Sequence, residues 1–331
     1  MIMKRALITG IAGQDGSYLA ELLLAKGYEV HGIVRRIAIE DSEHKLKNIG
    51  HILDRVQLHV ASLDNVLSLI KLVKDLAPDE CYHLASSSFV SYSFEDEISI
   101  LNNNVNSTHY LLATIREFSP SCRFYFAGTS EMIGAVDHAP QDEKSPFNPR
   151  SIYGISKVAG YHLVKNYRNQ YGMFACSGIL YNHESPRRGY EFVTRKIVAS
   201  AVKIKMGFQK QLILGNLDAS RDWGFAPDYV NAMWLMLQRK EPDDYVVATG
   251  ETHTVREFAA TAFSCLGLDY QQYVAVDPKF FRPAEKIELC GNPARIVMEL
   301  GWSRTKTFSE IVELMIDNEM RLYREKQTQG R

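Results

Sequence analysis

The sequence predicts an α/β protein with a doubly wound parallel sheet and a second, smaller and discontinuous domain. Two observations predict the sheet: short apolar runs alternate with amphipathic stretches through the first half of the chain, and these runs are apolar on both faces. Such alternation places crossover helices between parallel strands, in a sheet that is covered on both sides. In order, we expect strands at 5–9, 29–34, 57–60, 80–84, 123–127 and 174–180, and helices at 16–26, 66–76, 104–118 and 153–171.

Beyond residue 182 the alternation loosens, and Gly, Pro, Arg and aromatic residues become frequent. This composition is typical of chain that leaves a sheet to cover a ligand. A helix at 228–238 and a strand at 245–248 resume the first pattern, and amphipathic helices follow at 255–266 and 308–323. The first domain is therefore predicted over 1–181, with 226–250 returning to it, and the second over 182–225 and 251–331.

The bulk properties exclude several classes of partner. A net charge of −1 over 331 residues, with a pI of about 6.8, argues against binding to nucleic acid or to an anionic membrane. The short apolar run after Lys4 and Arg5 ends at a polar turn, which predicts a first strand rather than a signal peptide. No stretch approaches the roughly 20 apolar residues of a membrane span, so we expect a cytoplasmic protein. We also expect no metal site, and buried, reduced thiols without a CxxC pair at Cys81, Cys122, Cys176, Cys265 and Cys290.

A glycine-rich turn, TGIAGQDG at 9–16, follows the first predicted strand and opens the first helix. Gly10, Gly13 and Gly16 lack a Cβ, which allows the backbone to approach a pyrophosphate, and the free amides of the helix N-terminus then face the phosphates. Glycines are common in turns, but this position directly after the first strand favours dinucleotide binding.

The second strand is followed by Arg35 and Arg36, where an acidic residue would accept hydrogen bonds from the ribose hydroxyls of NAD. Two guanidinium groups suit a 2′-phosphate instead, so the sequence favours NADP. The alternative is that both arginines are solvated surface charges.

Two further motifs indicate acid–base chemistry. Tyr153 and Lys157 lie four residues apart in a predicted helix, so their side chains share one face. The ammonium is expected to lower the pKa of Tyr153 until its phenolate can act as a base. Thr129 and Glu131 follow the fifth strand, where a doubly wound sheet opens its ligand crevice. Either motif alone is common by chance, and their combination with the glycine turn predicts a catalytic site.

Longer segments resemble the GDP-mannose 4,6-dehydratases, a family of extended short-chain dehydrogenases/reductases with a Rossmann fold. The similarity runs from Arg5 to about Trp302 and is carried by TGIAGQDGSYLAELLLAKGYEVHGIVRR, TSEMIG, SIYGISK, YNHESPRRGYEFVTRKI, LGNLDASRDWGFAPDYVNAMWLMLQ and FFRPAE. It implies an NADP-dependent lyase of deoxysugar biosynthesis that acts on a GDP-sugar. It also implies a homodimer or homotetramer, with the arginine loop near a subunit contact.

The reaction that the resemblance implies converts GDP-D-mannose to GDP-4-keto-6-deoxy-D-mannose. Tyr153 takes the C4 hydroxyl proton as hydride leaves C4 for the nicotinamide, which makes the C5 hydrogen acidic. Glu131 removes that hydrogen and, with Thr129, assists loss of the C6 hydroxyl as water, after which the hydride returns to C6. The implied catalytic residues are Thr129, Glu131, Tyr153 and Lys157.

The resemblance also implies two sets of binding residues. The cofactor set is Gly10, Gly13, Gln14, Asp15, Gly16, Arg35, Arg36, Asp64, Leu84, Ala85, Tyr153, Lys157, His183 and Arg188. The substrate set is Ser88, Glu131, Asn182, Val193, Lys196, Gly215, Arg221, Arg282 and Glu285. Two more cations, Arg187 and Arg195, lie in the same motifs, and Arg195 fits a helix surface equally well. Trp223 and Trp234 are expected in the core.

Three places depart from the family pattern. Ser62 stands where an aspartate usually holds the adenine, and the serines usual beside the 2′-phosphate are replaced by Ile37, Ala38 and Ile39. The sequence SSS at 86–88 lacks the glutamine that is usual near the reacting sugar. A related sugar, such as a GDP-heptose, is therefore an alternative substrate.

Two other functions fit part of the pattern. A GDP-sugar 4-dehydrogenase, 4-reductase or epimerase would share Tyr153 and Lys157, but Glu131 argues against it because those reactions need no base at C5. A catalytically silent nucleotide-binding regulator could share the fold. The presence of all four catalytic residue types argues against that interpretation.

Overall fold

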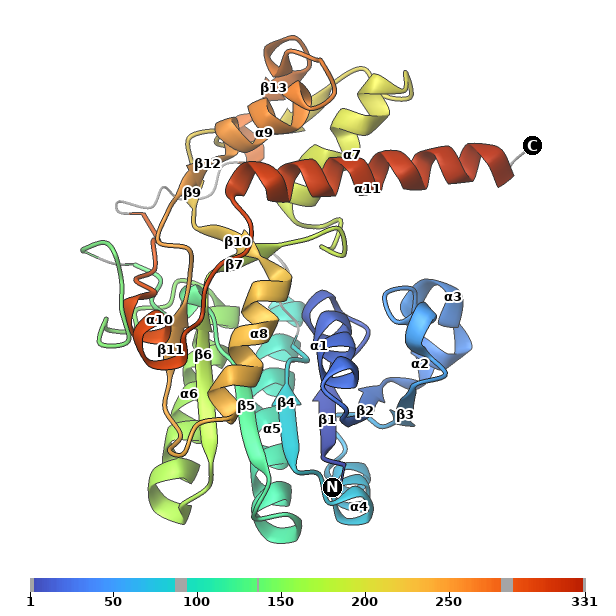
Figure 1. Cartoon of the computed structure of the whole chain (residues 1–331). Coiled ribbons are helices and arrows are strands. Elements are labelled where there is room, and N and C mark those ends of the chain that lie inside the picture. Colours follow the sequence, from blue (N-terminus) through green and yellow to red (C-terminus); the bar gives the residue numbers. More distant parts are fainter. Residues whose placement is uncertain (1–2, 87–93, 136, 281–287, 330–331) are drawn as a thin grey trace.

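Figure 1 shows the computed structural model as a large lobe, in which helices cover a sheet, and a smaller lobe above it. The structure describes residues 3–86, 94–135, 137–280 and 288–329. Over these residues no helix is both long and apolar enough to cross a membrane, and no cluster of three His, Cys, Asp or Glu side chains could hold a metal ion.

Seven parallel strands form the main sheet in the order β11-β6-β5-β4-β1-β2-β3. They are β1 (Arg5–Thr9), β2 (Glu29–Val34), β3 (Val56–Val60), β4 (Glu80–His83), β5 (Arg123–Ala127), β6 (Ala175–Leu180) and β11 (Tyr245–Val247). The order reverses between β1 and β4, and a doubly wound sheet opens its ligand crevice at this point. The predicted fold class is confirmed.

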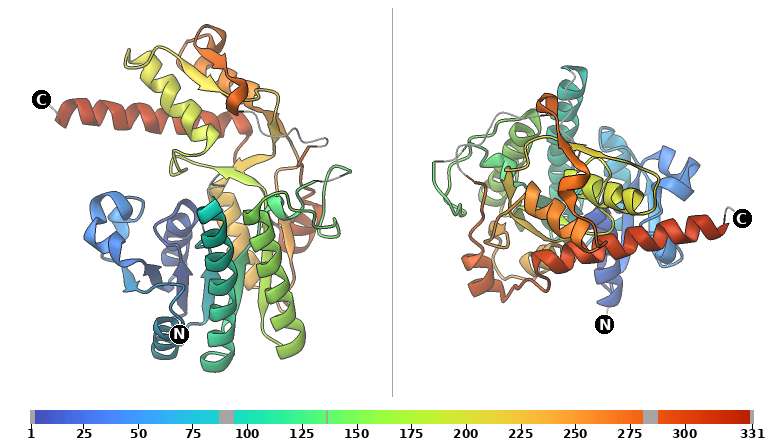
Figure 2. Two further views of the ribbon diagram at one scale, coloured as in Figure 1. Left: turned by 180° about the vertical axis from the view of Figure 1, so that it is seen from behind. Right: turned by 90° about the horizontal axis from the view of Figure 1, so that it is seen from above.

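Helices cover both faces of this sheet. One face carries α1 (Gln14–Ala25) and α8 (Ala226–Leu237), and the other, seen from behind in Figure 2, carries α4 (Val66–Leu76), α5 (Phe94–Phe118) and α6 (Ile152–Tyr171). Successive residues of a strand point to opposite faces, so Leu7 and Ile8 of β1 enter separate apolar cores. Burial on both faces explains why β1, β4, β5 and β6 have no exposed side, whereas the edge strand β3 is partly exposed.

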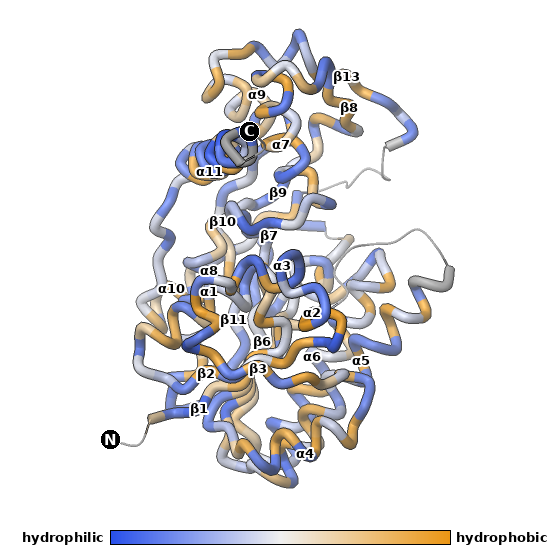
Figure 3. Tube along the Cα trace, turned by 90° about the vertical axis from the view of Figure 1, so that its right-hand side faces the viewer, coloured by the Kyte–Doolittle hydropathy of each residue, from blue (hydrophilic) through white to orange (hydrophobic). Residues whose placement is uncertain are grey.

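The small lobe has a third apolar core. It is built from α7 (Val193–Lys205), α9 (Val255–Ser264), α11 (Phe308–Gln329) and the pair β8 (Leu212–Leu214) and β13 (Val274–Val276). Figure 3 shows α11 almost end-on beside α7 and α9, largely in hydrophilic colours. Its buried apolar side chains are Ile311, Val312, Met315 and Ile316.

Short elements connect the two lobes. The strand pairs are β7 (Asn182–Glu184) with β10 (Trp223–Phe225), and β9 (Ser220–Arg221) with β12 (His253–Thr254). The remaining short helices are α2 (Arg36–Glu40), α3 (Ser42–Lys45), α10 (Ala294–Leu300) and the 3₁₀ turns η1 (Gly50–Ile52), η2 (Ser130–Met132), η3 (Tyr270–Gln272) and η4 (Pro278–Phe280). In α10 and just after it, Ile296 and Trp302 pack with the core of the large lobe.

Most predicted elements exist with ends shifted by a few residues, but three predictions were wrong or incomplete. Helix α5 begins at Phe94 rather than at 104, because a run of asparagines, which are poor helix formers, hides its middle. Helix α7 was missed, and so were the short strands β7, β8, β9, β10, β12 and β13, since strands of two or three residues show no periodicity. Cys265 is exposed and Cys290 is half-buried, so the expectation of buried thiols holds only for Cys81, Cys122 and Cys176.

Candidate active site

The glycine turn between β1 and α1 leaves room for a phosphate. Gly10 has a φ of +76°, and a Cβ there would lie 3.1 Å from the Cα of Ala85. A Cβ on Gly16 would lie 2.2 Å from the carbonyl oxygen of Gly10. Gly13 precedes α1 and has no side chain to cap it, so the first amides and the positive end of the helix dipole can meet an anion. These residues fit the pyrophosphate of a dinucleotide.

Asp15 and His183 form a buried ion pair that joins this turn to β7. His183 Nε2 lies 2.9 Å from Asp15 Oδ2, and His183 Nδ1 lies 2.7 Å from the Tyr181 carbonyl oxygen. Burial is the largest single effect and opposes charge on both groups. The charge attraction and the hydrogen bond between them together outweigh it, with help from Gln14 and Arg188 for Asp15, so the pKa of His183 is raised and that of Asp15 is lowered. Gln14 adds a second link, because its amide donates to the His183 carbonyl and accepts from Ser185. The turn and β7 are thus held together by charge and hydrogen bonds.

Helix α6 brings Tyr153 and Lys157 to the crevice. Ser151 caps the helix, its Oγ accepting a hydrogen bond of 3.0 Å from the amide of Gly154. Gly154 also allows close packing, because a Cβ there would lie 2.6 Å from the carbonyl oxygen of Glu131. The helix therefore starts directly against the loop that carries Glu131.

Tyr153, Thr129 and Glu131 meet at the carboxyl end of β5. The Thr129 hydroxyl accepts a hydrogen bond of 3.3 Å from the Glu131 amide and is also hydrogen-bonded to Tyr153. Burial raises the pKa of Tyr153, and the charge of Glu131 raises it further, whereas Arg188 and the bond with Thr129 lower it. The arrangement places a phenol and a carboxylate around one position in the crevice.

The ammonium group of Lys157 does not contact Tyr153 in the way that the sequence predicted. Its ammonium donates to the Ala127 carbonyl at 2.8 Å and lies 5.7 Å from the centre of the Tyr153 ring. Burial lowers the pKa of Lys157 to about 7. The prediction that Lys157 brings the pKa of Tyr153 below its ordinary value is wrong for this structure, because the ammonium points at a carbonyl and burial dominates the phenol.

Arg188 is the cation that the structure brings to the catalytic residues. It forms an ion pair of 3.2 Å with Glu184, its guanidinium lies 3.6 Å from the centre of the Phe192 ring, and only 14% of its side chain is exposed. Its charge lowers the pKa values of Tyr153 and Asp15. An arginine held in this way stabilises negative charge beside the crevice.

The other two arginines of this region have structural partners. Arg187 donates to Ser17 and Glu21 of α1 and stacks on Tyr18. Arg195 is buried in an ion pair with Glu319 of α11. The interpretation of Arg195 as a surface residue was therefore wrong, because the two long helices of the small lobe pack over it.

The expected substrate residues are distributed over the small lobe and its connectors. Those that the structure describes, besides Glu131, are Asn182 in β7, Val193 and Lys196 in α7, Gly215 directly after β8 and Arg221 in β9. Lys196 donates to the Ile213 carbonyl at 2.8 Å, which ties α7 to β8. Ser88, Arg282 and Glu285 lie outside the described residues.

The adenine end of the predicted cofactor site lies beyond β2 and β3. Arg35 precedes α2 and is exposed, and Arg36, with 85% of its side chain exposed, pairs with Glu40 at 3.1 Å. Ser62 and Asp64 are exposed in the loop after the neighbouring strand β3. Both arginines are thus surface charges in this structure, at the edge where the carboxyl ends of the strands gather.

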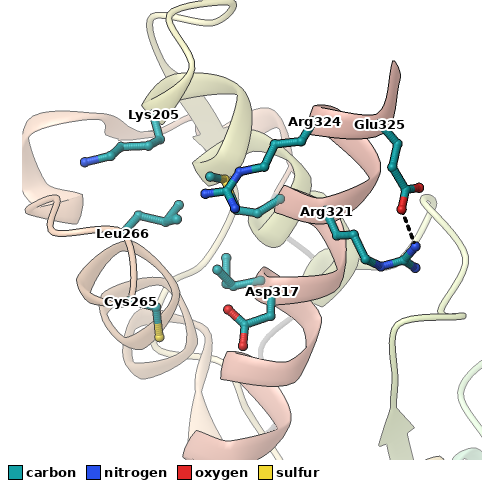
Figure 4. A pocket seen from close by; sticks show the side chains of 9 residues that line it. Lys205, Cys265, Leu266, Asp317, Arg321, Arg324 and Glu325 are labelled. Atoms are coloured by element: carbon teal, nitrogen blue, oxygen red, sulfur yellow. Dashed lines mark hydrogen bonds and ion pairs between the residues drawn. The ribbon is translucent and has the colours of Figure 1, made fainter. Parts of the chain in front are cut away.

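A cavity of about 600 Å³ in the small lobe is separate from these residues. Figure 4 shows its wall, formed by α7, α9 and α11. The lining residues are Lys205, Cys265, Leu266, Ile316, Asp317, Met320, Arg321, Arg324 and Glu325. Lys205 lies in the last turn of α7, whose dipole favours a cation, and Arg321 is paired with Glu325. Because none of the predicted site residues lines this cavity, we assign it no part in the reaction.

Sequence reasoning missed two buried polar residues near the connectors. Asp222 accepts hydrogen bonds from the amides of Thr249 and Gly250, and burial raises its pKa to about 6. Gln141 accepts hydrogen bonds from Tyr181 and from the amide of Cys290. Neither residue had a distinctive local signal, because Asp222 directly follows Ser220 and Arg221, and Gln141 lies in a polar stretch.

A nucleotide turn at the strand reversal, a Tyr-x-x-x-Lys helix beside it and a second lobe above the crevice are features of the extended short-chain dehydrogenases/reductases. The family model described as GDP-mannose 4,6 dehydratase matches residues 7–315. This chain belongs to the GDP-mannose 4,6-dehydratase family.

Individual relatives agree with that assignment. GDP-mannose 4,6 dehydratase 2 of Arabidopsis thaliana is 48% identical over 96% of this chain and 87% of its own length. The Drosophila melanogaster GDP-mannose 4,6 dehydratase is 45% identical over 97% of this chain and 87% of its own. Among solved structures, the UDP-glucose 4-epimerase of Thermus thermophilus, in complex with NAD, has a TM-score of 0.81 at 26% identity and covers 95% of this chain and 98% of its own.

Proposed function

We propose that this enzyme is a lyase that converts GDP-D-mannose to GDP-4-keto-6-deoxy-D-mannose in deoxysugar biosynthesis. Membership of the family supports the reaction. At the level of residues, the observation that carries the proposal is the meeting of Thr129, Glu131 and Tyr153 at the end of β5. A base beside the tyrosine is what elimination across C5 and C6 requires and what simple oxidation at C4 does not.

NADP is the cofactor in this proposal. The glycine turn fits a dinucleotide pyrophosphate, and Arg35 and Arg36 supply positive charge for a 2′-phosphate at the end of β2. When bound, NADP would supply the hydride acceptor for oxidation at C4 and the hydride donor for C6.

The side chains of the site carry out the proton transfers of the reaction. Tyr153 accepts the C4 hydroxyl proton, and the phenolate it needs for this is favoured by Arg188 and by the hydrogen bond with Thr129. Glu131 then removes the hydrogen at C5, which the ketone at C4 has made acidic. Glu131 and Thr129 deliver a proton to the departing C6 hydroxyl, which leaves as water. When hydride is added at C6, the proton that Tyr153 holds is delivered to C5, so that both side chains return to their starting states. Lys157, fixed on the Ala127 carbonyl, adds positive charge close to the phenol.

The nucleotide sugar is expected in the small lobe. Asn182, Lys196 and Arg221 are proposed contacts of the GDP moiety, since guanidinium and ammonium groups match phosphate oxygens. In this scheme 1–181 with 226–250 binds the dinucleotide, and 182–225 with 251–331 binds the sugar nucleotide. We further propose a cytoplasmic homodimer or homotetramer.

A single incubation tests the proposed reaction. Purified protein is mixed with GDP-mannose and NADP, and the products are examined by mass spectrometry. We expect a 4-keto product that is lighter than GDP-mannose by one water. Oxidation without loss of water would instead indicate a 4-dehydrogenase, and absence of turnover with GDP-mannose, GDP-heptose or any other GDP-sugar would indicate a regulator.

The preference for NADP gives a separate prediction. Replacing Arg35 and Arg36 by glutamine should weaken NADP binding by about tenfold or more, the size expected for lost charge-assisted hydrogen bonds, and change NAD binding much less. Arg55→Gln is the matched control, because Arg55 is an exposed arginine at the amino end of the neighbouring strand β3, away from the carboxyl end where Arg35 and Arg36 lie. Calorimetric titration with both cofactors measures the difference. Equal losses for NADP and NAD would refute the 2′-phosphate assignment.

A further inference from the structure

A buried chain of polar side chains runs beneath the crevice from the glycine turn to helix α6. Its members come from β1, β4, α5 and α6, and none is more than 6% exposed: Thr9, His83, Thr108, Asn104 and Ser156. We call this set the switch-point chain. Polar groups buried to this extent require hydrogen-bond partners. The partners here include one another, nearby backbone and the buried Ser107 hydroxyl, which lies 3.5 Å from His83 Nε2.

The first link is directional. Thr9 Oγ1 accepts hydrogen bonds from the amides of Leu84 at 3.1 Å and Ala85 at 3.0 Å. A hydroxyl has two acceptor positions and one hydrogen, so the hydrogen of Thr9 must go to His83 Nδ1, which lies 2.9 Å away. Nδ1 of His83 is therefore an acceptor, and the ring is neutral with its hydrogen on Nε2.

The second link continues from the other ring nitrogen. His83 Nε2 lies 3.2 Å from Thr108 Oγ1, and Thr108 donates its own hydrogen to the Asn104 carbonyl at 2.8 Å. The bond between His83 and Thr108 is thus donated by the imidazole. Burial and the charge of Lys157 lower the pKa of His83 to about 3, so the neutral ring persists at ordinary pH.

The far end of the switch-point chain reaches helix α6, which carries Tyr153 and Lys157. The Asn104 side-chain amide donates to Ser156 Oγ at 3.0 Å, and Ser156 donates to the carbonyl of Tyr153 at 2.7 Å. Lys157 is the next residue in the helix. The chain therefore ends on the backbone of the turn of α6 that carries both expected catalytic residues.

The switch-point chain lies at the point of the sheet where the cofactor is expected to bind. Thr9 and His83 are register partners at the carboxyl ends of β1 and β4, the two strands between which the strand order reverses. The same Thr9 hydroxyl holds the Leu84–Ala85 backbone against Gly10. Three separate parts of the proposed cofactor site are thus tied to one imidazole.

We propose that His83 is a positioning residue for the nicotinamide cofactor, fixing the Gly10–Gly16 turn, the Leu84–Ala85 backbone and helix α6 in one arrangement. This inference rests on the proposed function, because it assumes that a dinucleotide lies between these segments. His83 contributes through its neighbours and takes no proton in the reaction.

Four variants test the inference. His83→Phe keeps a planar ring but loses both bonds, and Thr9→Val loses the hydroxyl and keeps the shape. His83→Asn keeps an acceptor near the position of Nδ1, and Thr9→Ser keeps the hydroxyl, so these two are the matched controls. The measurements on full-length protein are the dissociation constants of NADP and NAD by calorimetry, the thermal midpoint, and kcat and KM for GDP-mannose.

We expect His83→Phe and Thr9→Val to weaken binding of the preferred cofactor by about tenfold, as loss of buried hydrogen bonds would, and the two controls to remain within about threefold of wild type. The KM for GDP-mannose should stay close to wild type while kcat falls. Unchanged cofactor affinity in His83→Phe and Thr9→Val, even with a lower thermal midpoint, would overturn the inference. A wild-type protein that binds neither NADP nor NAD would contradict the proposed function instead.

Discussion

Glu131→Gln should reduce the rate of product formation by about 10²- to 10⁴-fold, the usual contribution of a general base. Glutamine keeps the shape of the side chain but cannot accept the C5 proton. Oxidation at C4 depends on Tyr153 and should continue. With GDP-mannose and NADP, the variant should therefore accumulate reduced nicotinamide, which stopped-flow absorbance detects directly.

The control for this variant is Glu117→Gln, which makes the same chemical change on the exposed side of α5 and should leave turnover unchanged. An inactive Glu131→Gln protein without reduced nicotinamide would assign Glu131 to binding or structure. A variant that still forms the dehydrated product at the wild-type rate would remove Glu131 from the mechanism.

Lys157→Met should have opposite effects on activity and stability. Loss of the ammonium removes the positive charge close to Tyr153, and we expect kcat to fall by roughly 10²- to 10⁴-fold. The same substitution removes a buried charge whose burial opposes folding, and replaces it with an apolar chain of similar length. We expect the free energy of unfolding to rise by about 1–4 kcal/mol at neutral pH.

The pH dependence of this gain follows from the pKa of Lys157. Burial lowers it to about 7 in the folded protein, from an ordinary value of 10.5. Because the unfolded chain binds this proton up to about pH 10.5 and the folded protein only up to about pH 7, wild-type stability from this group rises with pH between those values.

The advantage of Lys157→Met should therefore be largest at pH 7 or below and should vanish toward pH 10.5. Urea unfolding of wild type, Lys157→Met and the exposed control Lys165→Met across this range measures the effect. A Lys157→Met protein that is less stable than wild type at pH 7 would show that the hydrogen bond with Ala127 outweighs the burial of charge.

The large lobe could be predicted from the sequence because its physical signals are local. Strands buried on both faces contain continuous apolar runs, as in ALI and FYFA, and the glycine turn closely follows the first of them. The small lobe gave weaker signals. Strands β9 and β12 have two residues each and exist because of their pairing with each other, which no local pattern reveals.

The identities of the candidate catalytic residues could be predicted from the sequence, but their electrostatics could not. Motifs name Thr129, Glu131, Tyr153 and Lys157, and the structure brings them together at the end of β5. Their electrostatics could not be read from spacing, because the direction of the Lys157 ammonium depends on the Ala127 carbonyl, which is remote in sequence.

The ion pair between Asp15 and His183 could not be predicted for the same reason, since the two residues are far apart in the sequence. His83 gave one local signal that sequence reasoning did not use: it is a polar residue that ends a buried strand.

The most direct test of the mechanism follows the hydrogen that leaves C4. GDP-mannose carrying deuterium at C4 is converted by the enzyme with unlabelled NADP, and the product is examined by NMR. The proposal predicts deuterium at C6 of the 4-keto-6-deoxy product, because one enzyme-bound nicotinamide takes the hydride and returns it. Deuterium that remains at C4, or is released on a free reduced cofactor, would contradict the proposed dehydration.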